Sequence, residues 1–167
     1  LPMLEGLQRM APNQPQVLFL LGSIYLARKQ HAQAMDYFER AAANTSSMDP
    51  VRELGLSQIG LGQGKAGMAN LEKVFAKNSR DLRAGIQLAI NHARQGQSAR
   101  AVQVAESIVK SDPSNLAMLN FLGNIKGRVG DKRGARQAFE QVVAKDPNFR
   151  PGGINLSWLD IEEKRFD

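Results

Sequence analysis

Apolar residues return along this chain at steps of three and four, the spacing that places side chains on one face of an α-helix. The first set is Leu18, Leu21, Ile24 and Tyr25, and the second is Ala34, Phe38, Ala41 and Ala42. A polar break over residues 28–31 separates the two sets. The pattern therefore predicts two short helices joined by a turn.

The same arrangement recurs with a period of 34 residues. Leu21-Gly22 has its counterpart in Leu122-Gly123, and Ala34-x3-Phe38 has its counterpart in Ala135-x3-Phe139. A fixed period of this length indicates one small motif that is stacked, so function is expected on a surface of the stack. The register divides the chain into residues 1–14, 15–47, 48–81, 82–115, 116–149 and 150–167. We expect a single array, with four whole units between two half-units, cut from a longer protein.

The Leu-Gly pair, the Ala-x3-Phe spacing and a closing proline resemble the tetratricopeptide repeat, a helix-turn-helix of 34 residues. This resemblance implies an all-α superhelix of about nine to ten antiparallel-paired helices. Gly22 is expected where the two helices of a hairpin approach closely, with Phe38 filling the gap against the next unit. Residues 48–81 depart most from the pattern, because Gly67 stands where Ala34 does and further glycines surround it. Since glycine weakens helices, we expect a loose or bent hairpin there.

The net charge of +6 is compatible with an acidic partner, but a solvated helical surface with surplus Lys and Arg is the favoured interpretation. The densest basic cluster consists of Lys126, Arg128, Lys132, Arg133 and Arg136. No aromatic residue interleaves with it, as a stacking platform for single strands would require, so nucleic acid is not the expected partner. Without Cys, the chain has no disulfide, thiol nucleophile or thiolate metal site. No window reaches the roughly 18 apolar residues of a membrane span.

Residues suited to catalysis are sparse. His31 and His92 fall in different units, and neither has a second His at metal-binding spacing. The acidic group of Asp160, Glu162 and Glu163 is best explained as the exposed face of a final helix. A catalytic site needs titratable groups that converge in a pocket. We therefore expect no enzyme, and no catalytic, cofactor-binding or metal-binding residue.

The resemblance also implies that the first helix of each unit lines a concave groove. The candidate binding residues there are Arg83, Gln87, Arg94, Asn120, Phe121, Asn124, Arg128, Asn155 and Trp158. Amides can bond the backbone of an extended peptide, guanidinium groups can hold carboxylates, and aromatic rings can anchor apolar side chains. Alternatively, the aromatic residues belong to the helix packing. The sequence thus predicts a scaffold that binds a peptide or helix of a partner protein.

A finer resemblance concerns the stretch Phe149-x-Pro151 and the following Asn155-Leu156-x2-Leu159-Asp160. It is similar to a run in bacterial tetratricopeptide lipoproteins of exosortase (PEP-CTERM) and exopolysaccharide systems. That resemblance implies a periplasmic scaffold, lipid-anchored through an N-terminus outside this sequence. The residues themselves name no compartment.

Two other functions stay open. In the first, the array would serve as a structural spacer or would self-associate through apolar surface at its ends. The end surfaces would be formed by Leu4, Leu7 and Met10, or by Ile154, Trp158 and Ile161. The other is a polysaccharide-binding module, although an aromatic content of 6% leaves few rings to stack on sugars.

Overall fold

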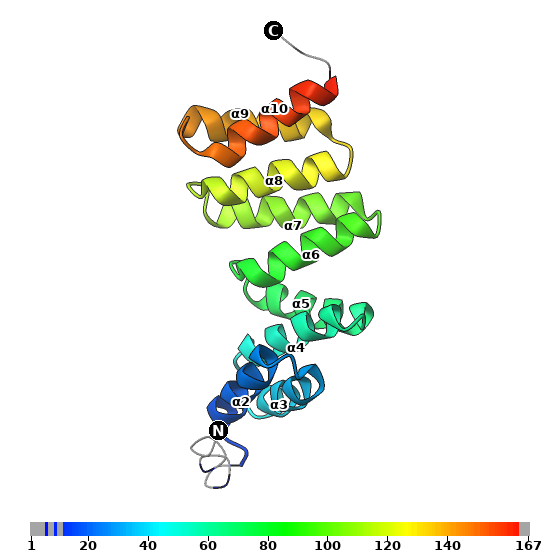
Figure 1. The fold of residues 1–167 in the computed structure, drawn as a ribbon, viewed down its shortest axis with the longest axis vertical. Coiled ribbons are helices and arrows are strands. Elements are labelled where there is room, and N and C mark those ends of the chain that lie inside the picture. Colours follow the sequence, from blue (N-terminus) through cyan, green and yellow to red (C-terminus); the bar gives the residue numbers. More distant parts are fainter. Residues whose placement is uncertain (1–5, 7–8, 10–11, 164–167) are drawn as a thin grey trace. The chain divides into compact units, whose positions relative to one another are not determined.

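The computed structural model describes residues 6, 9 and 12–163. That part of the chain holds nine α-helices and no strand, which confirms the expected all-α class (Figure 1). The helices are α2 (Pro15–Ala27), α3 (His31–Ala43), α4 (Asp49–Gly60), α5 (Gly64–Lys77), α6 (Leu82–Arg94), α7 (Ser98–Ser111), α8 (Leu116–Arg128), α9 (Lys132–Lys145) and α10 (Arg150–Glu163). The chain divides into two compact units: unit 1, residues 1–78, and unit 2, residues 79–167.

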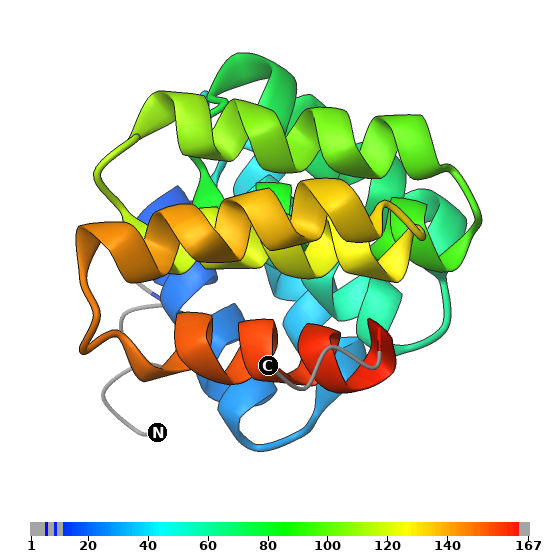
Figure 2. The ribbon, with the colours of Figure 1, turned by 90° about the horizontal axis from the view of Figure 1, so that it is seen from above.

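The helices form consecutive hairpins. In unit 1, α2 packs against α3 and α4 against α5. In unit 2, α6 packs against α7, α8 against α9, and α10 against α9. Seen from above in Figure 2, α8 and α9 lie between α7 and α10. Since α8 also contacts both α6 and α10, these three helices form one continuous surface, which we term the first-helix face of unit 2.

Each hairpin turns at a residue with a left-handed backbone. These residues are Lys29, Gly62, Gly96 and Gly130, with φ of 61°, 81°, 72° and 89°. A Cβ is crowded in this conformation, so glycine suits it. Lys29 adopts this left-handed conformation although it has a Cβ, so its backbone is strained at this position.

Polar side chains hold the starts of three helices in unit 2. Asp81, Asn115 and Asp131 accept hydrogen bonds from the backbone N–H groups of Ala84, Met118 and Gly134. Each bond satisfies a donor that the first turn of a helix leaves free. The caps fix where α6, α8 and α9 begin, and so which of their residues share a face.

Glycines let the helices of a hairpin approach closely. A Cβ on Gly22 would lie 2.7 Å from two ring carbons of Phe38, and a Cβ on Gly123 would collide with Phe139. Phe38 was expected to fill the gap against the next unit; the structure shows in addition that each of these rings lies against the glycine of its own hairpin. Phe139 additionally packs with Leu159 of the following helix.

The hairpin of α4 and α5, expected to be loose or bent, is closely packed at Gly67. A Cβ on Gly67 would lie 2.5 Å from the carbonyl oxygen of Gly55 and 2.6 Å from a side-chain carbon of Ile59. The two helices therefore touch backbone to backbone, which only glycine permits. Of the glycines expected to loosen this hairpin, Gly67 is instead restrained by close packing, whereas Gly60, Gly62 and Gly64 have no neighbour within 4 Å of a Cβ position.

Candidate functional site

Two hollows lie side by side on the first-helix face of unit 2. The α8–α10 hollow has a volume of about 220 Å³, and the α6–α8 hollow has a volume of about 500 Å³. Asn124, Gly127 and Arg128 line both of them. Gly127 and Arg128 stand three and four positions after Asn124 along α8, so the three residues share one face of that helix. They form the boundary between the hollows.

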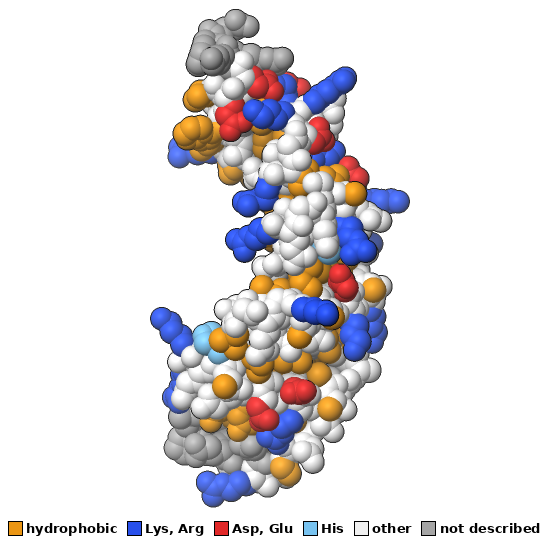
Figure 3. Space-filling model, turned by 90° about the vertical axis from the view of Figure 1, so that its right-hand side faces the viewer, with side chains coloured by type: hydrophobic (Ala, Val, Ile, Leu, Met, Phe, Trp, Pro, Cys, Tyr) orange, Lys and Arg blue, Asp and Glu red, His pale blue; other side chains and the backbone are white. Residues whose placement is uncertain are grey.

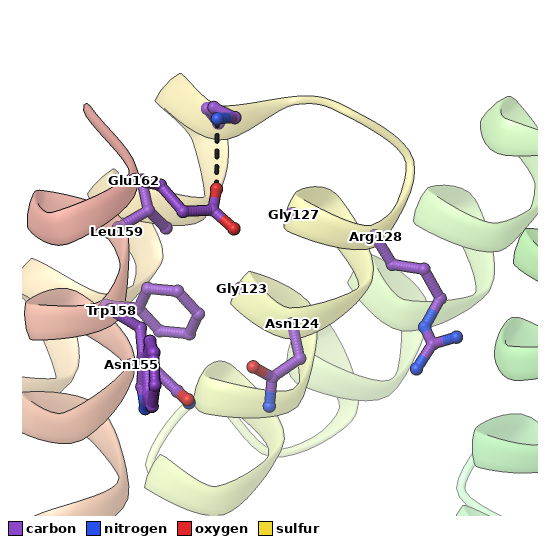
Figure 4. Close-up of a pocket in the computed structure, with 10 residues that line it drawn as sticks. Gly123, Asn124, Gly127, Arg128, Asn155, Trp158, Leu159 and Glu162 are labelled. Atoms are coloured by element: carbon purple, nitrogen blue, oxygen red, sulfur yellow. Dashed lines mark ion pairs between the residues drawn. The ribbon is translucent and has the colours of Figure 1, made fainter. Parts of the chain in front are cut away.

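The α8–α10 hollow is largely apolar inside. Gly123, Phe139 and Leu159 line it together with Trp158. Figure 4 shows Trp158 on α10 and Asn124 on α8 facing each other across the space. The hollow thus offers an apolar interior with polar groups at its edge, the usual composition of a ligand site.

The α6–α8 hollow is bounded by Ile90 from α6 and by Phe121 and Ile125 from α8. Ile90 and Phe121 are half-buried and also pack against the core of unit 2. Their exposed parts present apolar surface beside Asn124 and Arg128. The expected role of Phe121 as an apolar anchor remains a prediction.

Trp158 is 62% exposed. The sequence left open whether this ring belongs to the helix packing, and the structure places it outside that packing. Its indole lies at the solvent edge of α10, where it lines the α8–α10 hollow. An exposed ring of this size is available to a ligand, since burying it would remove a large apolar area from water.

The asparagines divide into two groups. Asn120 is buried, and its Oδ1 accepts a hydrogen bond of 3.0 Å from Nδ2 of Asn155. This bond links α8 to α10 and occupies part of both amides. Asn124 is exposed, and its side chain makes no hydrogen bond within the described part of the chain. Of the three, Asn124 has its full bonding capacity open to a ligand.

Some cations of the basic cluster form ion pairs within the molecule, and others do not. Lys126 pairs with Glu106 at 3.1 Å, and Lys132 pairs with Glu162 at 3.0 Å, the pair dashed in Figure 4. Acidic and basic side chains are also interspersed on the face shown in Figure 3. Much of the positive charge is therefore matched inside the molecule, which favours the solvated-surface interpretation for these lysines.

Arg136 is the most enclosed cation of the cluster. Its Nη2 donates to Asp160 Oδ1 at 2.6 Å and to Glu163 Oε2 at 2.8 Å, which ties α9 to α10. The hydrogen bonds to Asp160 and then Glu163 raise the pKa of the guanidinium above its already high ordinary value. The acidic group of α10, expected to be merely exposed, is thus the partner of the basic group on α9.

Arg128 differs from these three cations. It is exposed, and its guanidinium group makes no ion pair or hydrogen bond with any described residue. Arg94, in the equivalent last position of α6, is in the same state. Both sit at helix C-termini, where the macrodipole stabilises a cation. Arg128 therefore offers an unmatched positive charge at the boundary between the hollows.

Five of the nine candidates line the hollows, namely Phe121, Asn124, Arg128, Asn155 and Trp158. Arg83, Gln87, Arg94 and Asn120 do not line either hollow. In the α8–α10 hollow, sequence reasoning missed Gly123, Gly127, Lys132, Phe139, Leu159 and Glu162. One signal was present for Gly127: the corresponding residues, three before the left-handed turn residue, are Leu26, Ile59 and Ala93.

Chemistry other than binding finds little support in the described residues. They contain no group of three or more His, Cys, Asp or Glu side chains able to hold a metal ion. The buried His92 places Nδ1 2.6 Å from Oε1 of Gln97, so this ring nitrogen already has a partner. Within the same part of the chain, no helix combines the length and the apolar character that crossing a membrane requires.

Comparison with known proteins agrees with the repeat. The family model described as tetratricopeptide repeat matches residues 1–49 and 86–148. No curated protein matches the chain.

Several solved structures share the fold. The C-terminal part of a TPR repeat-containing protein from Cytophaga hutchinsonii has a TM-score of 0.83 at 14% identity, over 98% of this chain and 65% of that one. MamA from Desulfovibrio magneticus, from residue 41 to its end, has a TM-score of 0.74 at 16% identity, over 90% of this chain and 85% of that one. YrrB, described as a TPR protein with an unusual peptide-binding site, has a TM-score of 0.70 at 18% identity, over 89% and 77%. At these identities the likeness shows the fold, and it confirms the expected solenoid class.

Proposed function

Because this chain belongs to the tetratricopeptide-repeat family, we propose that it is a non-enzymatic scaffold that binds a peptide segment of a partner protein. The proposed site is the first-helix face of unit 2. The observation that carries the proposal is the pair of hollows separated by Asn124 and Arg128, whose polar groups have no partner within the described chain. The peptide-binding site described for YrrB lends support from a protein of the same fold.

The chemistry of the boundary suits an extended peptide. An exposed amide can donate to a backbone carbonyl and accept from a backbone N–H group, so Asn124 can fix the peptide main chain. An unmatched guanidinium can hold a carboxylate, so Arg128 favours an acidic partner segment. The helix pairs already hold these groups in place, which limits the entropy that binding costs on this side.

A random peptide library displayed on phage and selected on the intact chain tests the proposal. The enriched peptides should bind the wild-type protein and lose about tenfold or more in affinity to the Asn124→Ala, Arg128→Ala double variant, because a charge-assisted bond contributes about 1.5–3 kcal/mol. The Arg133→Ala, Asn148→Ala double variant removes the same groups elsewhere in unit 2 and should bind normally. Equal affinity of all three proteins would exclude this face as the site.

We further propose that the array serves a bacterial exopolysaccharide-export or protein-sorting system, from the periplasmic side. The support is the resemblance in residues 149–160 alone. We also propose the division into four whole units flanked by half-units, at the boundaries given by the 34-residue register. The complete reading frame tests both proposals. A lipoprotein signal sequence ahead of the array and further repeats are expected. A reading frame that begins directly before residue 1 without an export signal would contradict them.

A second candidate function is self-association through α10. Ile154, Trp158 and Ile161 are 55%, 62% and 53% exposed and lie along one face of the helix. The opposite set, Leu4, Leu7 and Met10, falls on residues outside the described part. Sedimentation velocity over a concentration series checks this candidate, with Ile154→Lys as the variant expected to abolish any dimer. A monomer at all concentrations would exclude it.

A further inference from the structure

We propose that the α8–α10 hollow is a pocket for one aromatic side chain of the bound peptide, beside an acidic residue that Arg128 holds. This inference rests on the proposed function, and it specifies the partner: an acidic peptide with an aromatic residue and a second apolar residue on either side of the acid. Four features of unit 2 support it.

The first feature is the size of the hollow. Its volume is about 220 Å³. An apolar cavity of roughly 150 Å³ in another protein is known to bind benzene. The hollow therefore accepts one ring with its connecting methylene group, and it is too small for two side chains of that size.

The second feature is the absence of a packing reason for Gly127. A Cβ at this position would meet only Ala135 Cβ, at 3.7 Å, which is an ordinary contact. Gly123, one turn earlier, is different because a Cβ there would collide with Phe139. Glycine inside a helix costs about 1 kcal/mol relative to alanine. At Gly127 the missing side chain leaves the hollow open, and it does not improve the packing of α8 against α9.

The third feature is the wall opposite Gly127. Trp158 presents its indole at the edge of the hollow (Figure 4). Phe139 also lines the hollow and is buried. A ring entering between them would pair with aromatic faces, which contributes about 0.5–1.5 kcal/mol beyond the burial of area. It would also cover part of the exposed Trp158. These gains favour an aromatic over an aliphatic side chain.

The fourth feature is the charge and spacing at the boundary. Arg128 lines both hollows and lacks an ion pair in the described chain, whereas Lys126 and Lys132 are matched. Packed helices lie about 8–10 Å apart, so the two hollows are separated by roughly that distance. An extended chain advances about 3.3 Å per residue. The two apolar side chains are therefore two or three positions apart, with the acid between them.

Capped synthetic peptides provide the probe. Each contains Leu, Asp and Phe with the apolar residues two or three positions apart, in both orders, and matched peptides replace Phe by Leu or Ala, or Asp by Asn. Trp158 is the single tryptophan of the chain, so its emission reports on this pocket directly. Binding of a Phe peptide should shift the emission to the blue, with at least fivefold higher affinity than its Ala counterpart.

Two variants separate the pocket from the groove. Gly127→Leu fills the hollow and should remove the preference for Phe, while Gly60→Leu adds the same side chain on α4, where a Cβ meets nothing within 4 Å, and should change nothing. Arg128→Gln should remove the preference for Asp over Asn. Circular dichroism and the thermal midpoint verify that each variant is folded.

The outcomes are distinct. If Phe peptides bind and the Asn124→Ala, Arg128→Ala variant loses them, while Gly127→Leu binds as the wild type does, the pocket is wrong and the groove stands. Equal affinity for the Phe, Leu and Ala peptides, or an unmoved Trp158 emission, also overturns the pocket. If no peptide of this set binds, the inference fails, and the random library then decides separately whether the proposed function fails with it.

Discussion

Replacing Gly22 by alanine tests the packing rule on which every hairpin description rests. The new Cβ would lie 2.7 Å from Cδ1 and Cε1 of Phe38. Carbon atoms in ordinary contact are about 3.5–4.0 Å apart, so the ring has to move by roughly 1 Å. Phe38 is fully buried, which leaves it no open space to move into.

The magnitude follows from two opposing terms. Alanine in a helix interior gains about 1 kcal/mol over glycine, and overpacking a filled core costs about 1–3 kcal/mol. We expect Gly22→Ala to lower the free energy of unfolding by about 1 kcal/mol. Gly153→Ala is the matched control, because a Cβ on this helical glycine meets nothing within 4 Å. It should raise stability by about 0.5–1 kcal/mol.

Urea denaturation and thermal melting of both variants supply the measurement. For a chain of this length, 1 kcal/mol corresponds to about 2–4 °C in Tm, so the two variants should melt several degrees apart. Adding Phe38→Leu should recover part of the loss in Gly22→Ala, with a coupling energy of at least about 0.5 kcal/mol. Equal stabilisation by Gly22→Ala and Gly153→Ala would refute the close contact.

Three further predictions concern single positions. Gly67→Ala should destabilise unit 1 by about 3 kcal/mol in urea titrations, more than Gly22→Ala, because its Cβ would meet the backbone oxygen of Gly55, which cannot rotate away; a loss below 1 kcal/mol would contradict this. Lys29→Gly should raise the melting temperature by relieving about 1 kcal/mol of left-handed strain, and no change would show that the turn is unstrained. Ser114→Ala should raise the pKa of Asp112, measured by NMR titration of the carboxyl carbon, because the hydrogen bond from the Ser114 hydroxyl is the largest cause that lowers this pKa below its ordinary 3.8. A pKa that folding lowers stabilises the protein at pH above 3.8, and this contribution is lost as the pH falls through the lowered value. The wild type should therefore lose more stability on acidification than Ser114→Ala. An unmoved pKa of Asp112 in the variant would exclude the bond.

The helix pairs could be predicted from the sequence because their signals are local. Apolar steps of three and four mark the buried face of each helix, and Gly130-Asp131 marks a turn followed by a cap. In the structure Gly130 has a left-handed backbone and Asp131 caps α9. Local signals of this kind do not depend on which helix lies opposite, so the pattern was sufficient.

Contacts between helices were harder to infer. Propensity alone makes Gly67 a weak point, whereas its position against Gly55 makes it a tight one. The pairing of Asn120 with Asn155 joins residues 35 positions apart, and no pattern in the chain indicates that two amides at this separation bond to each other rather than to a ligand. The same holds for the bonds between Arg136 and the carboxylates of α10.

The site itself was partly predictable. The resemblance to the tetratricopeptide repeat implies that the first helices share one face, so Asn124 and Arg128 could be placed on that face from the resemblance together with the 34-residue register. What the register could not decide is which cations are already matched. Arg136 and Arg128 look equivalent in the sequence, but carboxylates of α10 hold the first and none of the described residues pairs with the second. Binding capacity depends on this difference.

Glycines show how stability and function are separated in this fold. Gly22 and Gly123 are required by a ring that lies against them, so replacing either harms the hairpin. Gly127 and Gly153 are not required in this way, since a Cβ at each would find open space or an ordinary contact. Gly127 nevertheless lines the α8–α10 hollow, and Gly153 lines a separate hollow on the outer side of α10; Trp158 lines both of these hollows. A helix that bears the cost of glycine without a packing reason is more stable with alanine, so selection for stability alone would not keep it. The space beside Trp158 is therefore the feature that a partner has to explain.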